Sequence, residues 1–191
     1  MLSRTGPNRR RRATNAVALS VGALLVTTGC GNNVDSHSDH TPQTLAVGKA
    51  REKTSSVSSQ ILELIGIKEG KVTKPGPSIS PCDEDPSHLY RANHPWSIYD
   101  VSSEDVLKDG FHRLRENLPK RGWKIVGYGP NKSKAKTLEL TADSAKDHYS
   151  INAELVVSSP TAGKESKPLI LVTVTSGCFR APDGTKLDQE F

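Results

Sequence analysis

The chain lacks a hydrophobic run long enough to cross a membrane. Its longest apolar stretch, residues 16–26, spans 11 positions, whereas a transmembrane helix needs about 20. Acidic residues are also absent before Asp35, although five arginines lie in that segment. A basic start followed by a short apolar core is typical of a secretory signal peptide, so we predict that residues 1–29 are such a signal. A membrane helix that is never cleaved is the alternative.

An excess of positive charge is lacking outside this segment. The 191 residues include 26 basic and 21 acidic side chains, and five of the basic ones lie within residues 1–29, which leaves 21 of each sign. The high isoelectric point therefore reflects the N-terminal segment and does not indicate a nucleic-acid partner.

Cysteine is scarce as well. Apart from Cys30, the chain contains only Cys82 and Cys178, which lie 96 positions apart. Because exported proteins meet an oxidising environment, this pair predicts a disulfide bond. Two buried thiols or a metal site are the alternatives, and two sulfurs without closely spaced histidines are a poor zinc signature.

Patterns that would indicate catalysis are few. No serine stands in a nucleophile-elbow pattern, and the glycines of residues 127–130 precede no expected helix, which indicates a turn and not a phosphate-binding loop. We therefore predict no catalytic residues, cofactor or metal. The side chains that keep other possibilities open are the potential general bases His94, His112 and His148, the acidic turn Asp83, Glu84 and Asp85 with His88, and the polar tract Asp35, His37, Asp39 and His40.

Aromatic residues make up only 5% of the chain, and four of them, two tryptophans and two tyrosines, lie within residues 96–128. Trp96, Tyr99, Trp123 and Tyr128 could line a ligand groove between helix and sheet, although core packing is the default role of such residues. A run of alternating lysines, Lys132, Lys134 and Lys136, could contact anionic lipid or polymer, or could simply keep a hairpin loop soluble.

Hydrophobic periodicity predicts two helices. Val57, Ile61, Leu64 and Ile65 recur at helical spacing, and Gly66 would end this short helix. The second, main helix begins after Ser102 or Ser103. Its apolar stripe ends before Pro119 and Gly122 and consists of Leu107, Phe111, Leu114 and Leu118.

The remaining apolar segments are typical of strands. Residues 89–92 and 96–101 are separated by Pro95, which indicates an edge or bulged position. Residues 123–128, 137–141 and 149–157 follow, and residues 169–174, apolar on both faces, predict a central strand. We expect an α+β fold in which one main amphipathic helix packs on a four- to five-stranded, mainly antiparallel sheet, preceded by a short N-terminal helix.

Residues 30–55 are mostly polar and predict a flexible tether, and residues 56–191 predict a single α+β domain. A tether of this length would have a root-mean-square reach of roughly 25–30 Å.

The residues that end the N-terminal segment carry a resemblance. Thr27, Thr28, Gly29 and Cys30 resemble the lipobox of bacterial lipoproteins, with Thr27 in place of the usual leucine. This resemblance implies that Cys30 is lipidated by a diacylglycerol thioether, with acyl chains such as palmitate. The chain would then be held on the extracytoplasmic face of the cell membrane. Ordinary cleavage that leaves Cys30 as a thiol is the alternative, and the export route, general secretory or twin-arginine, stays open.

Trp96, residues 118–123 and residues 176–179 look similar to small envelope lipoproteins of actinobacteria, which are largely uncharacterised. The resemblance implies an envelope location and no particular activity. We therefore expect a non-enzymatic anchored protein that binds an envelope protein, a lipid or a cell-wall ligand. A hydrolase or transferase of wall polymers that uses Asp83, Glu84 and His88, or a structural spacer, is the alternative.

Overall fold

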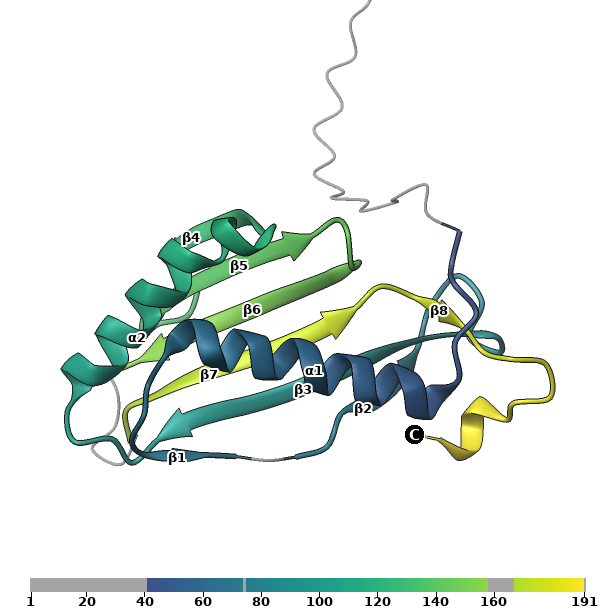
Figure 1. Ribbon diagram of the computed structural model, residues 1–191, viewed down its shortest axis with the longest axis horizontal. Helices are drawn as coiled ribbons and strands as arrows, with labels where there is room; N and C mark the ends of the chain where they lie inside the picture. Colours follow the sequence, from purple (N-terminus) through teal and green to yellow (C-terminus); the bar gives the residue numbers. More distant parts are fainter. Residues whose placement is uncertain (1–40, 74, 158–166, 191) are drawn as a thin grey trace, which may run out of the picture. The chain divides into compact units, whose positions relative to one another are not determined.

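Two helices lie on one face of an eight-stranded sheet (Figure 1). The computed structural model describes residues 41–73, 75–157 and 167–190. No helix among these residues has the length and apolar character needed to cross a membrane. The elements are α1 (Val47–Ile65), β1 (Lys71–Val72), β2 (Ser78–Pro81), β3 (Leu89–Tyr99), α2 (Glu104–Asn117), the 3-10 turn η1 (Pro119–Arg121), β4 (Lys124–Pro130), β5 (Leu138–Ser144), β6 (Tyr149–Val156), β7 (Leu169–Ser176), β8 (Phe179–Arg180) and the 3-10 turn η2 (Leu187–Gln189).

The sheet order is β1-β3-β7-β6-β5-β4, with β2 and β8 also paired to β3, and all these pairs are antiparallel. The predicted α+β class and antiparallel sheet are thus confirmed, and β7 is central as expected. The predicted count of four to five strands is too low. The extra strands β1, β2 and β8 have two to four residues each, too few for an alternating pattern to be detected in the sequence.

Strand β3 runs without a break through Pro95, which corrects the prediction of two separate stretches. Backbone N–H groups of β3 alternate in direction: that of Ala92 donates to Ser176 Oγ at the end of β7, and that of Ser97 donates to Thr73 Oγ1 on the opposite side. The Pro95 nitrogen therefore faces the same side as Ser97, in the interval between the residues that pair with β1 and with β2. A proline is tolerated there because no strand needs a hydrogen bond from its nitrogen.

Helix α1 is longer than predicted and has 19 residues, so the expected tether boundary at residue 55 is wrong. Its buried face continues N-terminally through Ala50 and Thr54, whose hydroxyl donates to Ala50 O and lies 3.1 Å from the Tyr149 hydroxyl. A buried threonine interrupts the apolar stripe in the sequence, but these partners satisfy its hydroxyl. The prediction that α1 is the shorter of the two helices is therefore wrong, since α2 has only 14 residues.

The stripe predicted for α2 is confirmed, since Leu107, Phe111, Leu114 and the following Leu118 are all buried. Ser103 occupies the N-cap position but makes no side-chain capping bond. Past the helix, Trp123 N–H donates to Leu118 O and Gly122 N–H to Pro119 O, with Gly122 at φ 82°. This is the Schellman arrangement, in which a left-handed glycine closes a helical end and brings two apolar side chains together.

Gly110 of α2 packs closely against the end of α1, where an added Cβ would lie 3.1 Å from Ile65 Cγ2 and 2.6 Å from Cδ1 of Ile67, just past that helix. Arg113 Nε also donates to Ile65 O, at the end of α1. The main core lies between these helices and the sheet, and a smaller core of eight buried residues lies around the start of α1: Val47, Ala50, Ile79, Tyr90, Ala92, Phe179, Ala181 and Leu187.

Tyr90 joins the smaller core to the segment before α1, and we expect it to make the protein sensitive to alkali. Its hydroxyl donates to Leu45 O at 2.7 Å, and burial raises the pKa of Tyr90 to about 12. The unfolded chain loses this proton near pH 10. Folding thus binds the proton more tightly, and the stabilisation present below pH 10 is lost as the pH rises toward about 12.

Urea unfolding followed by circular dichroism between about pH 9 and pH 11.5 would measure this loss. In Tyr90→Phe the free energy of unfolding should be about 1 kcal/mol lower at pH 8, because the bond to Leu45 O is missing. Above pH 10 it should decline less steeply than in the wild type. Parallel curves for the two proteins would contradict the assignment to Tyr90.

Candidate functional site

An apolar groove with a volume of about 440 Å³ lies beside α2. Helix α2, strand β4, the β4–β5 loop and strands β5 and β6 all contribute to it. The lining residues are Lys108, Phe111, His112, Tyr128, Ala135, Lys136, Thr137, Leu138, Leu155, Val156 and Val157. The volume lies within the range of about 300–1,000 Å³ that is usual for small-molecule sites.

The groove has a rigid floor and an exposed wall. Phe111 and Leu155, which belong to the buried core, are 1% and 6% exposed. Tyr128, on the edge strand β4, is 42% exposed. Its ring lies 6.5 Å from that of Phe111, and the guanidinium of Arg115 lies 4.1 Å from its centre. This cation–π contact fixes the orientation of a tyrosine that would otherwise be free to turn.

The charged side chains that line the groove are basic. Lys108 lies 2.9 Å from Asp105, whose hydrogen bond and charge raise the pKa of this lysine. His112 lies 3.6 Å from Glu116. Lys136, in the left-handed region at φ 51°, has no acidic partner within the described part of the chain. No carboxylate is among the described lining residues, so the rim favours a ligand with negative charge.

The four aromatic residues predicted to face a ligand do not lie together. Trp96 and Trp123 are core residues, 4% and 9% exposed. Tyr99 lies three residues after Trp96 on β3. Because successive side chains along a strand point to opposite faces, Tyr99 lies on the other face of the sheet. Only Tyr128 lines the groove. The sequence had placed Phe111 in the core stripe, which is correct, but nothing in that periodicity showed that its ring would also border a groove.

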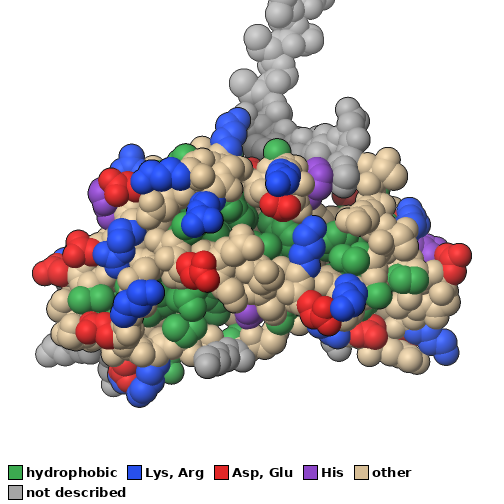
Figure 2. All heavy atoms as spheres, viewed as in Figure 1, with side chains coloured by type: hydrophobic (Ala, Val, Ile, Leu, Met, Phe, Trp, Pro, Cys, Tyr) green, Lys and Arg blue, Asp and Glu red, His purple; other side chains and the backbone are tan. Residues whose placement is uncertain are grey.

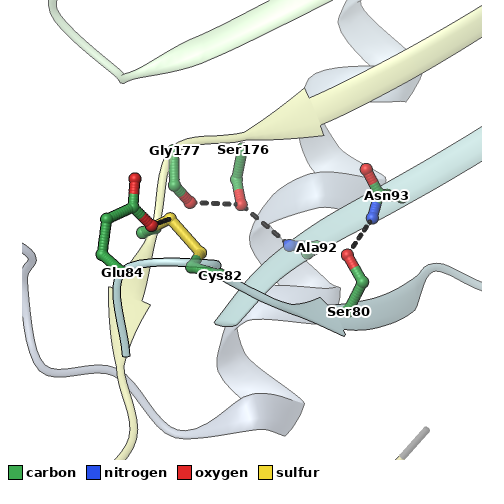
Figure 3. The surroundings of a disulfide bond; sticks show 8 residues. Ser80, Cys82, Glu84, Ala92, Asn93, Ser176 and Gly177 are labelled. Atoms are coloured by element: carbon green, nitrogen blue, oxygen red, sulfur yellow. Dashed lines mark hydrogen bonds between the residues drawn. A yellow bond between two sulfur atoms is a disulfide. The ribbon is translucent and has the colours of Figure 1, made fainter. Parts of the chain in front are cut away.

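The predicted disulfide is present: Cys82 and Cys178 are bonded, with their Cα atoms 6.3 Å apart (Figure 3). Between the pairs Asn93–Thr175 and Tyr90–Phe179, β3 advances three residues and its partner four, so the partner bulges at residues 176–178. Ser176 Oγ accepts the Ala92 N–H and donates to Gly177 O, which satisfies the ladder at this bulge. Residues 176–179 thus have structural roles. Ser176 bridges two backbone groups, Gly177 lies in the bulge, Cys178 forms the disulfide and Phe179 packs in the smaller core.

Glu84 completes a group of possible metal ligands with the two cysteines, since their ligand atoms lie within 4.8 Å of one another. The sulfurs are bonded to each other, however, and therefore offer no thiolates to a metal. The 4.0 Å contact from Cys178 Sγ to Glu84 is not a hydrogen bond either, because a disulfide sulfur carries no proton.

The residues considered for polymer hydrolysis do not assemble an acid–base pair. Asp83, Glu84 and His88 are all exposed on the turn between β2 and β3. Glu84 is directed toward the disulfide, whereas His88 Nδ1 lies 2.9 Å from Asp85, and this hydrogen bond lowers the pKa of the Asp85 carboxyl. The turn therefore provides a hydrogen-bonded Asp85–His88 pair rather than two carboxylates facing a common space.

His94 forms a contact that the sequence did not suggest. Its Nε2 lies 2.7 Å from Pro75 O, which can only accept, so Nε2 is the donor there, and Nδ1 lies 2.8 Å from the Ser58 hydroxyl. This is the geometry of an activated serine. Ser58 is only 4% exposed between α1 and the sheet, however, and the pair fastens the segment that joins β1 and β2. His148 contributes a backbone carbonyl that accepts from Gly177 N–H.

Two of the three loop lysines, Lys132 and Lys134, are exposed and do not line the groove, whereas Lys136 does. Cys30 and the polar tract Asp35, His37, Asp39 and His40 lie outside the described residues.

Comparison of the chain with protein-family models, with curated proteins and with solved structures gave no match. Function is therefore inferred from the residues of this chain alone.

Proposed function

We propose that the protein is a lipid-anchored envelope lipoprotein, held on the extracytoplasmic face of a membrane, whose α+β domain binds a ligand and does not catalyse a reaction. The observation that carries the binding role is the groove beside α2, because its floor is apolar and preformed and its charged rim has one sign. The anchoring role rests on the basic start, the short apolar run and Cys30 after Thr27, Thr28 and Gly29.

The disulfide supports the location outside the cytoplasm. Such bonds persist in oxidising compartments and are rare where thiols are kept reduced. The two acyl chains of a diacylglycerol thioether suffice for stable attachment, since a single chain binds a membrane only marginally.

We expect intact-mass analysis of the protein from membranes of the producing organism to show a chain that begins at Cys30 and carries added acyl mass. The variant Cys30→Ser should lack this mass and should leave the membrane fraction or accumulate as the uncut precursor. The matched control Ser36→Ala should behave as the wild type. An unmodified Cys30, or a mature N-terminus elsewhere, would contradict the anchor.

The binding role is tested separately. Thermal denaturation of the purified domain, residues 41–191, in the presence of lipids, wall-glycan fragments and membrane extracts should reveal a ligand that raises the midpoint. A domain that no class of envelope material stabilises would favour the structural-spacer alternative instead.

A further inference from the structure

The groove beside α2 restricts the chemistry of its ligand. Its floor consists of hydrocarbon from Phe111, Leu138, Leu155 and Val157, with the Tyr128 ring on one side. Among the described lining residues, only Thr137 and Tyr128 carry a hydroxyl group, and none carries a side-chain amide. A sugar needs several hydrogen-bonding partners, and burying its hydroxyls here would leave most of them unsatisfied. A flexible hydrocarbon chain matches this surface.

The rim adds a second restriction. Lys108 enters from α2 and Lys136 from the β4–β5 loop, so two cationic side chains from separate elements line one apolar groove. Lys108 is partly neutralised by Asp105. Lys136 is the stronger candidate to receive an anion, since no described acidic side chain pairs with it. His112 can add a hydrogen bond from the exposed side of α2.

We propose that this groove binds a single-chain anionic amphiphile, a fatty-acid anion, with its hydrocarbon on the Phe111–Leu155 floor and its carboxylate at Lys136 and Lys108. This inference rests on the proposed binding function and names the ligand class for that site. The groove lies on the helix side of the sheet, where hydrophobic side chains also reach the surface among basic and acidic ones (Figure 2).

Isothermal titration calorimetry with laurate, below the concentration at which it forms micelles, tests the proposal. Laurate should bind with one site per protein and decanoate roughly tenfold more weakly, because two buried methylenes are lost. Dodecyltrimethylammonium, which has the same chain and the opposite charge, should not bind measurably. Affinity for laurate should fall as salt screens the lysines.

Two variants locate the site. Lys136→Glu should weaken laurate binding roughly 5- to 20-fold through loss of attraction and added repulsion. Ala135→Trp should abolish it, because an exposed loop residue that lines the groove then fills the space. The matched controls are Lys120→Glu and Ala145→Trp, both exposed positions that do not line the groove. They should bind laurate as the wild type does, and circular dichroism should show that all four variants are folded.

Each contrary result is informative. Equal affinity for laurate and dodecyltrimethylammonium would overturn the role of the lysines, and an unchanged affinity of Ala135→Trp would overturn the location. Binding to phosphatidylglycerol vesicles without binding of monomeric laurate would overturn the proposal in favour of a membrane surface. If laurate fails while a wall-glycan fragment stabilises the domain, this inference fails and the proposed binding function stands.

Discussion

Replacing Cys82 and Cys178 together by alanine should lower the free energy of unfolding by about 4–5 kcal/mol. The bond closes a loop of 96 residues, and a cross-link of that length removes about 4.7 kcal/mol of conformational entropy from the unfolded chain in the simple loop model. Because a domain of this size is stable by only about 5–15 kcal/mol, the double variant should be close to its unfolding threshold.

Urea unfolding followed by circular dichroism measures this effect, and chemical reduction provides the matched control. Adding a reductant should bring the wild type to the stability of Cys82→Ala/Cys178→Ala and should leave that variant unchanged. A loss below about 1 kcal/mol would show that the unfolded chain gains little freedom when the bond is absent. Hydrogen exchange should increase most in the smaller core around Tyr90 and Phe179, because β8 and the β2–β3 turn are held together there.

Trp96→Ala should have the second large effect, a loss of about 3–5 kcal/mol, which is usual for removing a large buried aromatic side chain. Trp96 is 4% exposed in the main core with Ile61 and Ile65 of α1. Its indole nitrogen has no hydrogen-bond partner among the described residues. Trp96→Phe should therefore cost much less, since it removes volume but leaves no acceptor unsatisfied.

The comparison variant is Tyr128→Ala, which removes an aromatic ring that is 42% exposed. We expect it to cost no more than about 1 kcal/mol and to weaken laurate binding, whereas Trp96→Phe should leave that binding unchanged. Chemical unfolding and calorimetry on the same three variants check both statements. A stability loss for Tyr128→Ala as large as that for Trp96→Ala would contradict the division of these residues into core and groove.

The parts of the fold that could be predicted from the sequence are those in which local spacing and burial coincide. In α2, the stripe from Leu107 to Leu118 consists of large apolar side chains at helical intervals, and all four are buried. In β7, a continuous apolar run indicated a central strand, and β7 lies between β3 and β6. Its Leu171 is nevertheless 37% exposed, since both helices lie on the opposite face.

The errors have a different origin. The N-terminal half of α1 is stabilised by contacts such as Thr54 with Tyr149, which lie 95 residues apart. Pro95 fits within β3 because of where β1 and β2 end along it. Neither circumstance is visible in the local pattern of hydrophobic and polar residues, so a polar tract was predicted where a helix forms and a break where a strand continues.

The sequence by itself determined the charge balance outside the N-terminal segment, the disulfide pair, the α+β class and the amphipathic face of α2, because each depends on composition or on short-range periodicity. Tertiary structure alone decided the strand count, the length of α1 and the separation of Trp96, Tyr99 and Trp123 from Tyr128. It also decided the groove, whose lining combines Lys108, Tyr128, Lys136 and Leu155 from four parts of the chain. Such a site exists only when distant segments pack together, since no local rule states which side chains will meet.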